Sequence, residues 1–269
     1  MESEIADDGL PIMEVGDWAV NEKHRILGRY IDISHRARAK YTTRTYVDLF
    51  SGPGRIRIKG GSHLEHGSPI AALRMSESKS GGFTDFYIAD LDEKSLAACE
   101  TRLRSYGVTP VAKQGYAHET IDYFIQRLPA RALHLAILDP FNLSTLHFSI
   151  IEKLAYLPRI DIIVHLSTGD LQRNIGAQLT QTNSSFDLVA PGWRDVVAIR
   201  MSKSEMSQRF IEHWKSLVSS TGLMVSEQQH RVKNSKSSVM YRLLLLAKHD
   251  LAHHCWTEAC KIDQNRSLF

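Results

Sequence analysis

Short apolar strands alternate with helical stretches through most of this chain, and this alternation restricts its fold more than any other feature. The predicted strands are 46–50, 83–89, 108–113, 132–138 and 161–166, and the predicted helices between them are 70–75, 93–106, 119–128 and 149–156. Strands that are connected by helices form a mostly parallel sheet with helices on both faces. The sequence therefore predicts an α/β doubly wound domain.

The end of the chain follows a different pattern. A helix is predicted over 204–219, and two extended stretches, 224–233 and 239–248, flank the turn-rich residues 234–237. This arrangement is typical of a terminal antiparallel hairpin. Alternating units followed by a helix and a hairpin match the element order of a Rossmann-like methyltransferase domain.

Residues 1–45 are predicted as an N-terminal helical segment, and 46–269 as the α/β domain with an insertion at about 170–203. Between Glu22 and Arg44 there are seven lysines and arginines but only two acids. Apolar residues recur there at helical spacing, which places the charges on the other helix face. That face is either solvated or binds a polyanion such as a nucleic acid. The polar stretch 170–185 is predicted to be a mobile cover over a ligand.

Composition excludes several classes of protein. With 269 residues, of which 43% are hydrophobic, the chain can build a large core. No apolar run approaches the roughly 20 residues that span a bilayer, and the first ten residues are acidic, unlike a secretory leader. We therefore expect a cytoplasmic protein.

Cys99, Cys255 and Cys260 lack the spacing of a disulfide framework or zinc site, even with His253 and His254 nearby. Reduced thiols and no metal are therefore expected.

A glycine turn after the first predicted strand is the first candidate binding site. Ligands of doubly wound sheets bind at the carboxyl ends of the strands. Here Asp48 and Phe50 lead into Gly52 and Gly54, where the missing side chains let a ligand approach the backbone. These four residues are candidate cofactor contacts.

Asp90, at the end of the second strand, is placed to accept hydrogen bonds from ribose hydroxyls. Asp92 is instead interpreted as the N-cap of the next helix. Residues 55–67 separate the glycine turn from a helix, so no helix N-terminus is presented to a pyrophosphate, which argues against a dinucleotide. A phosphate-free cofactor fits better, and S-adenosylmethionine (SAM) has the ribose that Asp90 requires.

Seven segments together resemble a known family: Trp18–Tyr30, Tyr46–Gly54, Gly67–Pro69, Leu138–Phe141, Arg173–Asn174, Asn234–Ser235 and Tyr241–His249. The sequence resembles the three-Cys-motif partner protein (TcmP) family, which is itself similar to class I SAM-dependent methyltransferases. It implies a Rossmann-like class I methyltransferase fold and SAM as the cofactor. It also implies a companion, a radical-SAM-like iron–sulfur protein with three cysteines, whose motif the three cysteines here do not match.

The resemblance also assigns candidate roles. Asp139, Pro140 and Phe141 match the position where related nucleic-acid amino methyltransferases hold an acceptor amine with an Asp/Asn-Pro-Pro-aromatic loop. The second proline is replaced here by Phe141, and the aromatic residue by Asn142. Tyr116 stands where such enzymes often place an acid for the adenine amine, and a tyrosine can stack or hydrogen-bond there.

His63, His66 and His165 are candidate bases near the predicted acceptor, although an ordinary loop or packing histidine is the simpler interpretation of each. Two functions therefore remain open. One is a SAM-dependent methyltransferase that acts on a nucleic acid or small amine and in which Asp139 orients the acceptor. The other is a non-catalytic partner subunit that binds SAM or a nucleic acid for the iron–sulfur companion.

Overall fold

The computed structural model describes residues 4–16, 19–77, 80–233 and 239–261. Its main sheet has the order β10-β11-β8-β7-β2-β5-β6, and β9 also pairs with β11. The strands are β2 (Arg44–Asp48), β5 (Asp85–Asp90), β6 (Val111–Gln114), β7 (Leu133–Leu138), β8 (Ile160–Leu166), β9 (Met224–Val225), β10 (His230–Lys233) and β11 (Val239–Ala247).

The direction of the strands confirms the predicted fold class. Strands β6, β5, β2, β7 and β8 run parallel, whereas β11 is antiparallel to both β8 and β10. This is a Rossmann-like class I methyltransferase sheet with a C-terminal antiparallel hairpin. The strand order reverses at β2, which pairs with β5 on one side and β7 on the other. The predicted hairpin turn, 234–237, lies outside the described residues.

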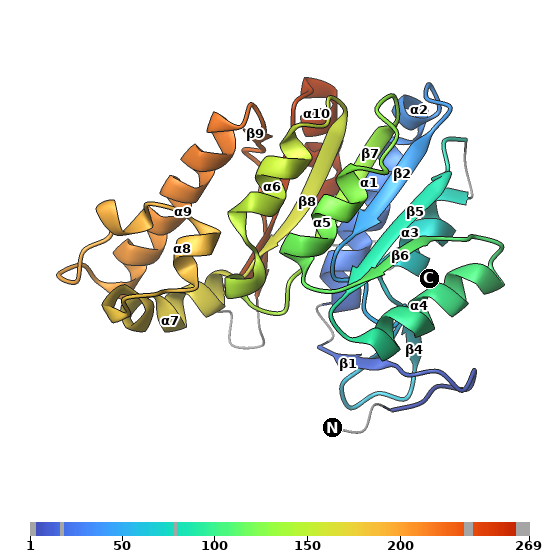
Figure 1. The fold of residues 1–269 in the computed structure, drawn as a ribbon, viewed down its shortest axis with the longest axis horizontal. Coiled ribbons are helices and arrows are strands. Elements are labelled where there is room, and N and C mark those ends of the chain that lie inside the picture. The colour runs from blue at the N-terminus through green and yellow to red at the C-terminus, as the bar shows by residue number, and fades with distance from the viewer. Residues whose placement is uncertain (1–3, 17–18, 78–79, 234–238, 262–269) are drawn as a thin grey trace.

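Helices cover both faces of the sheet (Figure 1). One face packs against α1 (Arg25–Ile33), α3 (Ser68–Glu77), α4 (Glu93–Ser105) and α10 (Asp250–Cys260). The other packs against α5 (Ala117–Ile125), α6 (Phe148–Ala155), α7 (Thr168–Thr180), α8 (Phe186–Val189) and α9 (Lys203–Ser220). Alternate residues of a strand supply the two cores: Leu135 and Ile137 face the first, Ala136 and Leu138 the second.

The structure confirms the prediction that Asp92 caps the helix α4. The Asp92 side chain accepts a hydrogen bond from the Ser95 amide and caps the helix. Gly107 follows the last turn with a φ of +80°, a conformation that favours glycine. Ser68 is the first residue of α3, and its hydroxyl donates to Asp48.

A second, smaller sheet was not predicted. It has the order β1-β3-β4, with β1 (Met13–Val15), β3 (Arg55–Ile58) and β4 (Leu64–His66). The amino-terminal segment therefore differs from the helical segment expected over 1–45. Helices within it are limited to η1 (Ala19–His24), α1 and α2 (His35–Arg38), because residues 13–15 pair with β3 instead.

The stretch 170–185, expected as a mobile cover, is mostly the helix α7. Leu171 and Ile175 are fully buried in the core that α7 shares with α9, because apolar residues recur on one face of this helix. A short helix, η3 (Trp193–Asp195), and α8 complete this region. The expectation of a loose cover is therefore wrong.

Within the part of the chain that the structure describes, no helix combines the length and the apolar character needed to cross a bilayer. The three cysteines are free and buried. Cys255 and Cys260 lie on α10 with His253, whose Nδ1 is 2.7 Å from the Ser226 hydroxyl.

Candidate functional site

A cavity of about 710 Å³ lies at the carboxyl ends of the parallel strands. Nine of the twelve candidate site residues line it: Phe50, Gly52, Gly54, Asp90, Tyr116, Asp139, Pro140, Phe141 and His165. They lie at or just after the carboxyl ends of β2, β5, β6, β7 and β8, so the topology gathers them at one edge of the sheet, beside the point where the strand order reverses. Asp48, His63 and His66 are not among its lining residues.

The glycine turn is shaped by the chain that returns to it. Gly52 and Gly54 have φ angles of +57° and +77°. The Gly67 amide donates to the Gly54 carbonyl at 2.9 Å, and a β-carbon on Gly67 would lie 2.9 Å from the Gly54 carbonyl carbon. Residues 55–67, which separate the glycine turn from α3, thus form the β3–β4 hairpin and the connection that follows it. This hairpin returns the chain to the glycine turn, so that α3 begins next to it.

Asp48 lies beneath the turn and is fully buried. Its carboxyl accepts hydrogen bonds from the Ser68 hydroxyl (2.7 Å), the Phe50 amide (3.0 Å) and the Tyr46 hydroxyl (3.0 Å). Burial raises the pKa of Asp48 to about 6, although these hydrogen bonds act to lower it. The structure thus assigns Asp48 to shaping the turn and α3, without contact with the cavity.

Asp90 connects the ends of two strands. Its Oδ2 accepts from the Gly52 amide at 2.8 Å, and its Oδ1 accepts from the Asp92 amide at 2.9 Å. Burial raises its pKa, and the two amides act to lower it. Each carboxylate oxygen can accept more than one hydrogen bond, so Asp90 can still receive ribose hydroxyls. Leu91 and Tyr116, each 53% exposed, also line the cavity.

Asp139 forms a polar network that the motif did not indicate. It pairs with the ammonium group of Lys23, and its Oδ1 is 2.5 Å from His165 Nδ1. Burial alone would raise the pKa of Asp139, but the charge of Lys23 and the hydrogen bond from His165 outweigh burial and hold this pKa well below its usual range. The carboxylate is therefore ionised at any ordinary pH.

The three candidate histidines lie in different surroundings. His165, one of the candidate bases, contacts Asp139 and packs on the Tyr241 ring, with centroids 3.9 Å apart. His66 lies on β4 against the edge of Tyr106, and His63 is exposed beside Glu65. Neither lines the cavity, whereas His24, which was not predicted, does. Burial and the neighbouring Lys23 lower the pKa of His24 to about 3 and keep it neutral.

The amino-terminal segment forms one wall of the cavity. Met13, Glu14 and Val15 of β1 line it, and a β-carbon on Gly52 would lie 3.3 Å from the Met13 methyl group. Met13 therefore packs over the glycine turn. The prediction of a separate N-terminal helical segment did not anticipate this contact.

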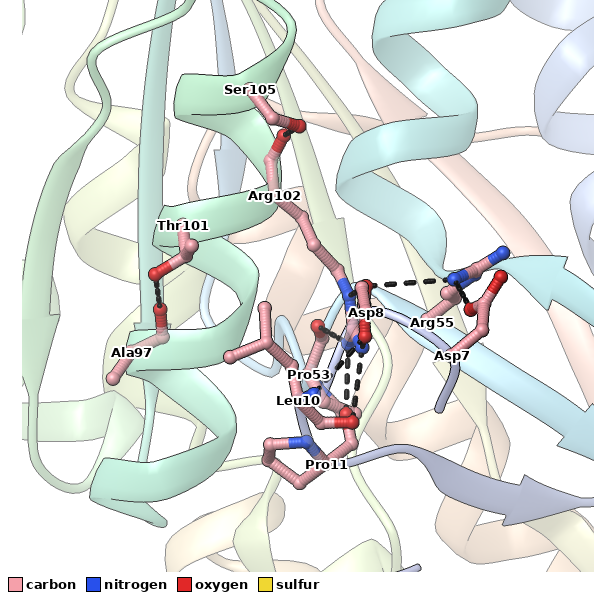
Figure 2. A network of polar contacts seen from close by, with 10 residues as sticks. All are labelled: Asp7, Asp8, Leu10, Pro11, Pro53, Arg55, Ala97, Thr101, Arg102 and Ser105. Carbon is pink, nitrogen blue, oxygen red and sulfur yellow. Dashed lines mark hydrogen bonds and ion pairs between the residues drawn. The ribbon is translucent and has the colours of Figure 1, made fainter. Parts of the chain in front are cut away.

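Arg102 of α4 joins this segment to the glycine turn (Figure 2). Its guanidinium donates to both carboxylate oxygens of Asp8 at 2.8 Å, to the carbonyls of Leu10 and Pro11, and to the Pro53 carbonyl at 2.6 Å. The arginine is 6% exposed. One buried side chain thus fixes both the wall and the turn.

We expect the ion pair between Arg102 and Asp8 to weaken at low pH. The hydrogen bonds from Arg102 lower the pKa of Asp8 from 3.8 to about 2. Because the folded-state pKa is the lower one, the pair stabilises the protein fully above the unfolded value and loses its effect as pH falls toward 2. We expect the difference in unfolding free energy between wild type and Asp8→Asn to shrink steadily over that window in urea titrations at stepped pH. A difference that is undiminished at pH 2 would contradict the assignment.

Most of the basic residues between Glu22 and Arg44 contact the protein itself. Lys23 pairs with Asp139, Arg25 with Glu22, and Arg29, Arg38 and Arg44 donate to backbone carbonyls. Arg36 and Lys40 are exposed to solvent. The alternative of a polyanion-binding face would therefore rest on few charges.

Comparison with known proteins gives a similarity of fold. No family model matches the sequence, and no curated protein matches it. Protein LPL1258 from Legionella pneumophila is 11% identical, with a TM-score of 0.52 over 87% of this chain and 86% of that one. The O-methyltransferase TomG from Streptomyces achromogenes, in complex with SAM, is also 11% identical, with a TM-score of 0.46 over 83% and 80%. A Bacillus cereus O-methyltransferase in complex with SAH is 9% identical, with a TM-score of 0.47 over 82% and 80%.

Identities this low bear on the fold alone. The resemblance to the TcmP family thus stays a prediction, whereas the order and direction of the strands establish a Rossmann-like methyltransferase fold for this chain.

Proposed function

We propose that this protein binds SAM in the cavity at the glycine turn and transfers its methyl group to an amine of a nucleic acid or small molecule. One observation carries the proposal: the residues that follow β2, β5, β6 and β7 meet in a single cavity. Its volume of about 710 Å³ lies within the range of about 300–1,000 Å³ that is common for ligand pockets.

The lining residues fit this cofactor part by part. The positive φ angles of Gly52 and Gly54 open the backbone to the amino-acid portion. Asp90 keeps acceptor capacity for the ribose hydroxyls. Leu91 and Tyr116 present apolar and aromatic surface that suits an adenine ring.

SAM supplies an electrophilic methyl group, and the protein's contribution is mainly to place the acceptor in line with it. Asp139 is suited to that task because its ionised oxygens accept hydrogen bonds from an amine. Its strongly lowered pKa makes it a poor base, so we assign it to orientation. Phe141, which is 85% exposed at the cavity, offers a ring beside it for a flat acceptor.

Cofactor binding is tested by calorimetric titration with SAM. We expect a micromolar dissociation constant, about 8 kcal/mol of binding free energy, that weakens at least tenfold in Asp90→Ala because the ribose contact is removed. The matched control is Asp92→Ala, which deletes a helix cap two residues away. It should cost about 1 kcal/mol of stability and leave SAM affinity unchanged. A wild-type protein that does not bind SAM would remove the proposal.

The role of Asp139 is tested with Asp139→Asn, which keeps the size of the side chain. Because misplacement of the acceptor by about 1 Å can cost about 100-fold in rate, we expect turnover to fall by that order while SAM affinity is kept. Methyl transfer to candidate DNA, RNA and small amines would be followed with radiolabelled SAM. Unchanged turnover in the variant would refute the assignment.

One observation supports a second candidate, a SAM-binding subunit that transfers nothing itself. The Lys23 ammonium already occupies the carboxylate that an acceptor amine would use. In that case the protein would serve the three-Cys-motif iron–sulfur companion that the family resemblance implies. Methyl transfer by the purified protein alone would exclude this candidate. SAM binding without transfer, together with co-elution with the companion, would support it.

A further inference from the structure

A second cavity, of about 250 Å³, lies at the opposite edge of the sheet, where β7 and β8 begin. Its walls come from α1, α2, the start of α10 and the first residues of those strands, and it shares no lining residue with the SAM cavity. In Figure 1, α2 lies at the upper end of the sheet, and β1 and β4 lie at the lower end. Anything bound here is therefore separate from the methyl-transfer site.

The cavity wall contains a partly buried acid. Asp161 of β8 accepts a hydrogen bond from the Tyr30 hydroxyl at 2.7 Å, and burial raises its pKa to about 6. Among the described residues, no lysine, arginine or histidine nitrogen lies within 4 Å of its carboxylate. A partly buried carboxylate with no cation at ion-pair distance is costly, and such a group in a cavity wall is typical of a binding site.

The same cavity also contains a buried cation. Arg38 is 4% exposed; its Nε donates to the Gly81 carbonyl at 3.0 Å and its Nη1 to the Ser34 hydroxyl at 2.5 Å. The guanidinium lies over the Phe83 ring, 5.2 Å from its centroid. Within the described part of the chain, the remaining nitrogen, Nη2, has no hydrogen-bond partner. Arg38 is therefore fixed in place and retains donors.

The other nearby cations are accounted for differently. Lys248 donates to the carbonyls of Ala155 and Leu157, where α6 ends, and is thereby engaged. Lys40 and Arg159 are exposed at the cavity's outer rim. Between the charged groups the wall is apolar, with Phe83, Leu133, Leu135 and Ala252.

We propose that this second cavity binds a free α-amino acid with an apolar side chain. The ammonium group would contact Asp161, the carboxylate would contact Arg38, and the side chain would pack among Phe83, Leu133 and Leu135. An acid and an arginine that do not pair with each other each need a partner of the opposite charge, and a zwitterion supplies both. An amine or a carboxylate alone would leave one of them unsatisfied.

The test is calorimetric titration of the full chain with L-phenylalanine and L-leucine, and with two half-ligands, phenethylamine and 3-phenylpropionate. We expect at least one amino acid to bind more tightly than either half-ligand. Asp161→Asn, which keeps an oxygen for the Tyr30 hydroxyl, should weaken that binding at least tenfold. Thermal unfolding of the variant would verify that it is folded.

Asp250→Asn is the matched control. Asp250 is an exposed acid at the start of α10 that does not line the cavity, so its removal should leave amino-acid affinity unchanged. The proposal is overturned if neither amino acid binds, if Asp161→Asn binds as well as wild type, or if either half-ligand binds as tightly as the tighter-binding amino acid. SAM titration is a separate experiment, so failure here leaves the proposed function untouched.

Discussion

Replacing Gly54 with alanine is expected to lower the free energy of unfolding by about 2–5 kcal/mol and to weaken SAM binding at least tenfold. Two costs add. A side chain at its φ of +77° costs about 1–2 kcal/mol. The new β-carbon would also lie 3.2–3.3 Å from Cys99 and Ile70, and such overpacking costs about 1–3 kcal/mol. Urea unfolding and SAM titration measure the two effects.

Gly107→Ala separates strain from packing. Gly107 has a φ of +80°, almost that of Gly54, but a β-carbon there would meet nothing within 4 Å. We expect it to cost only the conformational penalty of about 1–2 kcal/mol and to leave SAM affinity intact. If the two substitutions proved equally destabilising, the close packing of the glycine turn would not matter in the way that the structure indicates.

Replacing Arg102 with methionine is expected to cost about 2–4 kcal/mol of stability. Removing one partner of a buried charge pair costs about 3–5 kcal/mol, and the estimate is reduced because the Asp8 side chain is 32% exposed to solvent. The loss should also loosen residues 4–15, which hydrogen exchange would detect as faster amide exchange there. SAM affinity should fall as well, because the Pro53 carbonyl loses its donor.

Arg104 provides the control for this substitution on the same helix. Its side chain is 55% exposed and pairs with Glu100 one turn away, an arrangement worth only about 0.3–0.5 kcal/mol. Arg104→Met should therefore change stability little and leave exchange in residues 4–15 as it is. Equal effects of the two substitutions would show that the Arg102 network does not anchor the segment.

Local signals in the sequence were sufficient for the elements around α4. A capping aspartate at 92 and a glycine at 107 determine the ends of that helix through contacts within a few residues, and such contacts can be read from spacing. The same reasoning placed Asp90 and Asp139, because the end of an apolar strand in an α/β pattern lies at the binding edge of the sheet.

The short strands β3 and β4 were missed for a physical reason. Residues 55–58 alternate charged and apolar side chains, as in a strand. A stretch of only four residues next to a glycine-rich connection is too short for its β-propensity to predict a strand. Pairing with each other and with β1 makes them strands. His66 consequently lies on this small sheet, away from the cavity to which the sequence assigned it.

The sequence by itself determined the fold class, the edge of the sheet that forms the site, and the glycine turn with its acids, because period, capping and strand ends are local properties. Only the tertiary structure decided the partners of those acids. Lys23 and Asp139 are 116 residues apart, and Arg102 and Asp8 are 94 apart. No spacing rule connects residues at such distances; the packing of η1, α1 and α4 in the folded chain brings them together.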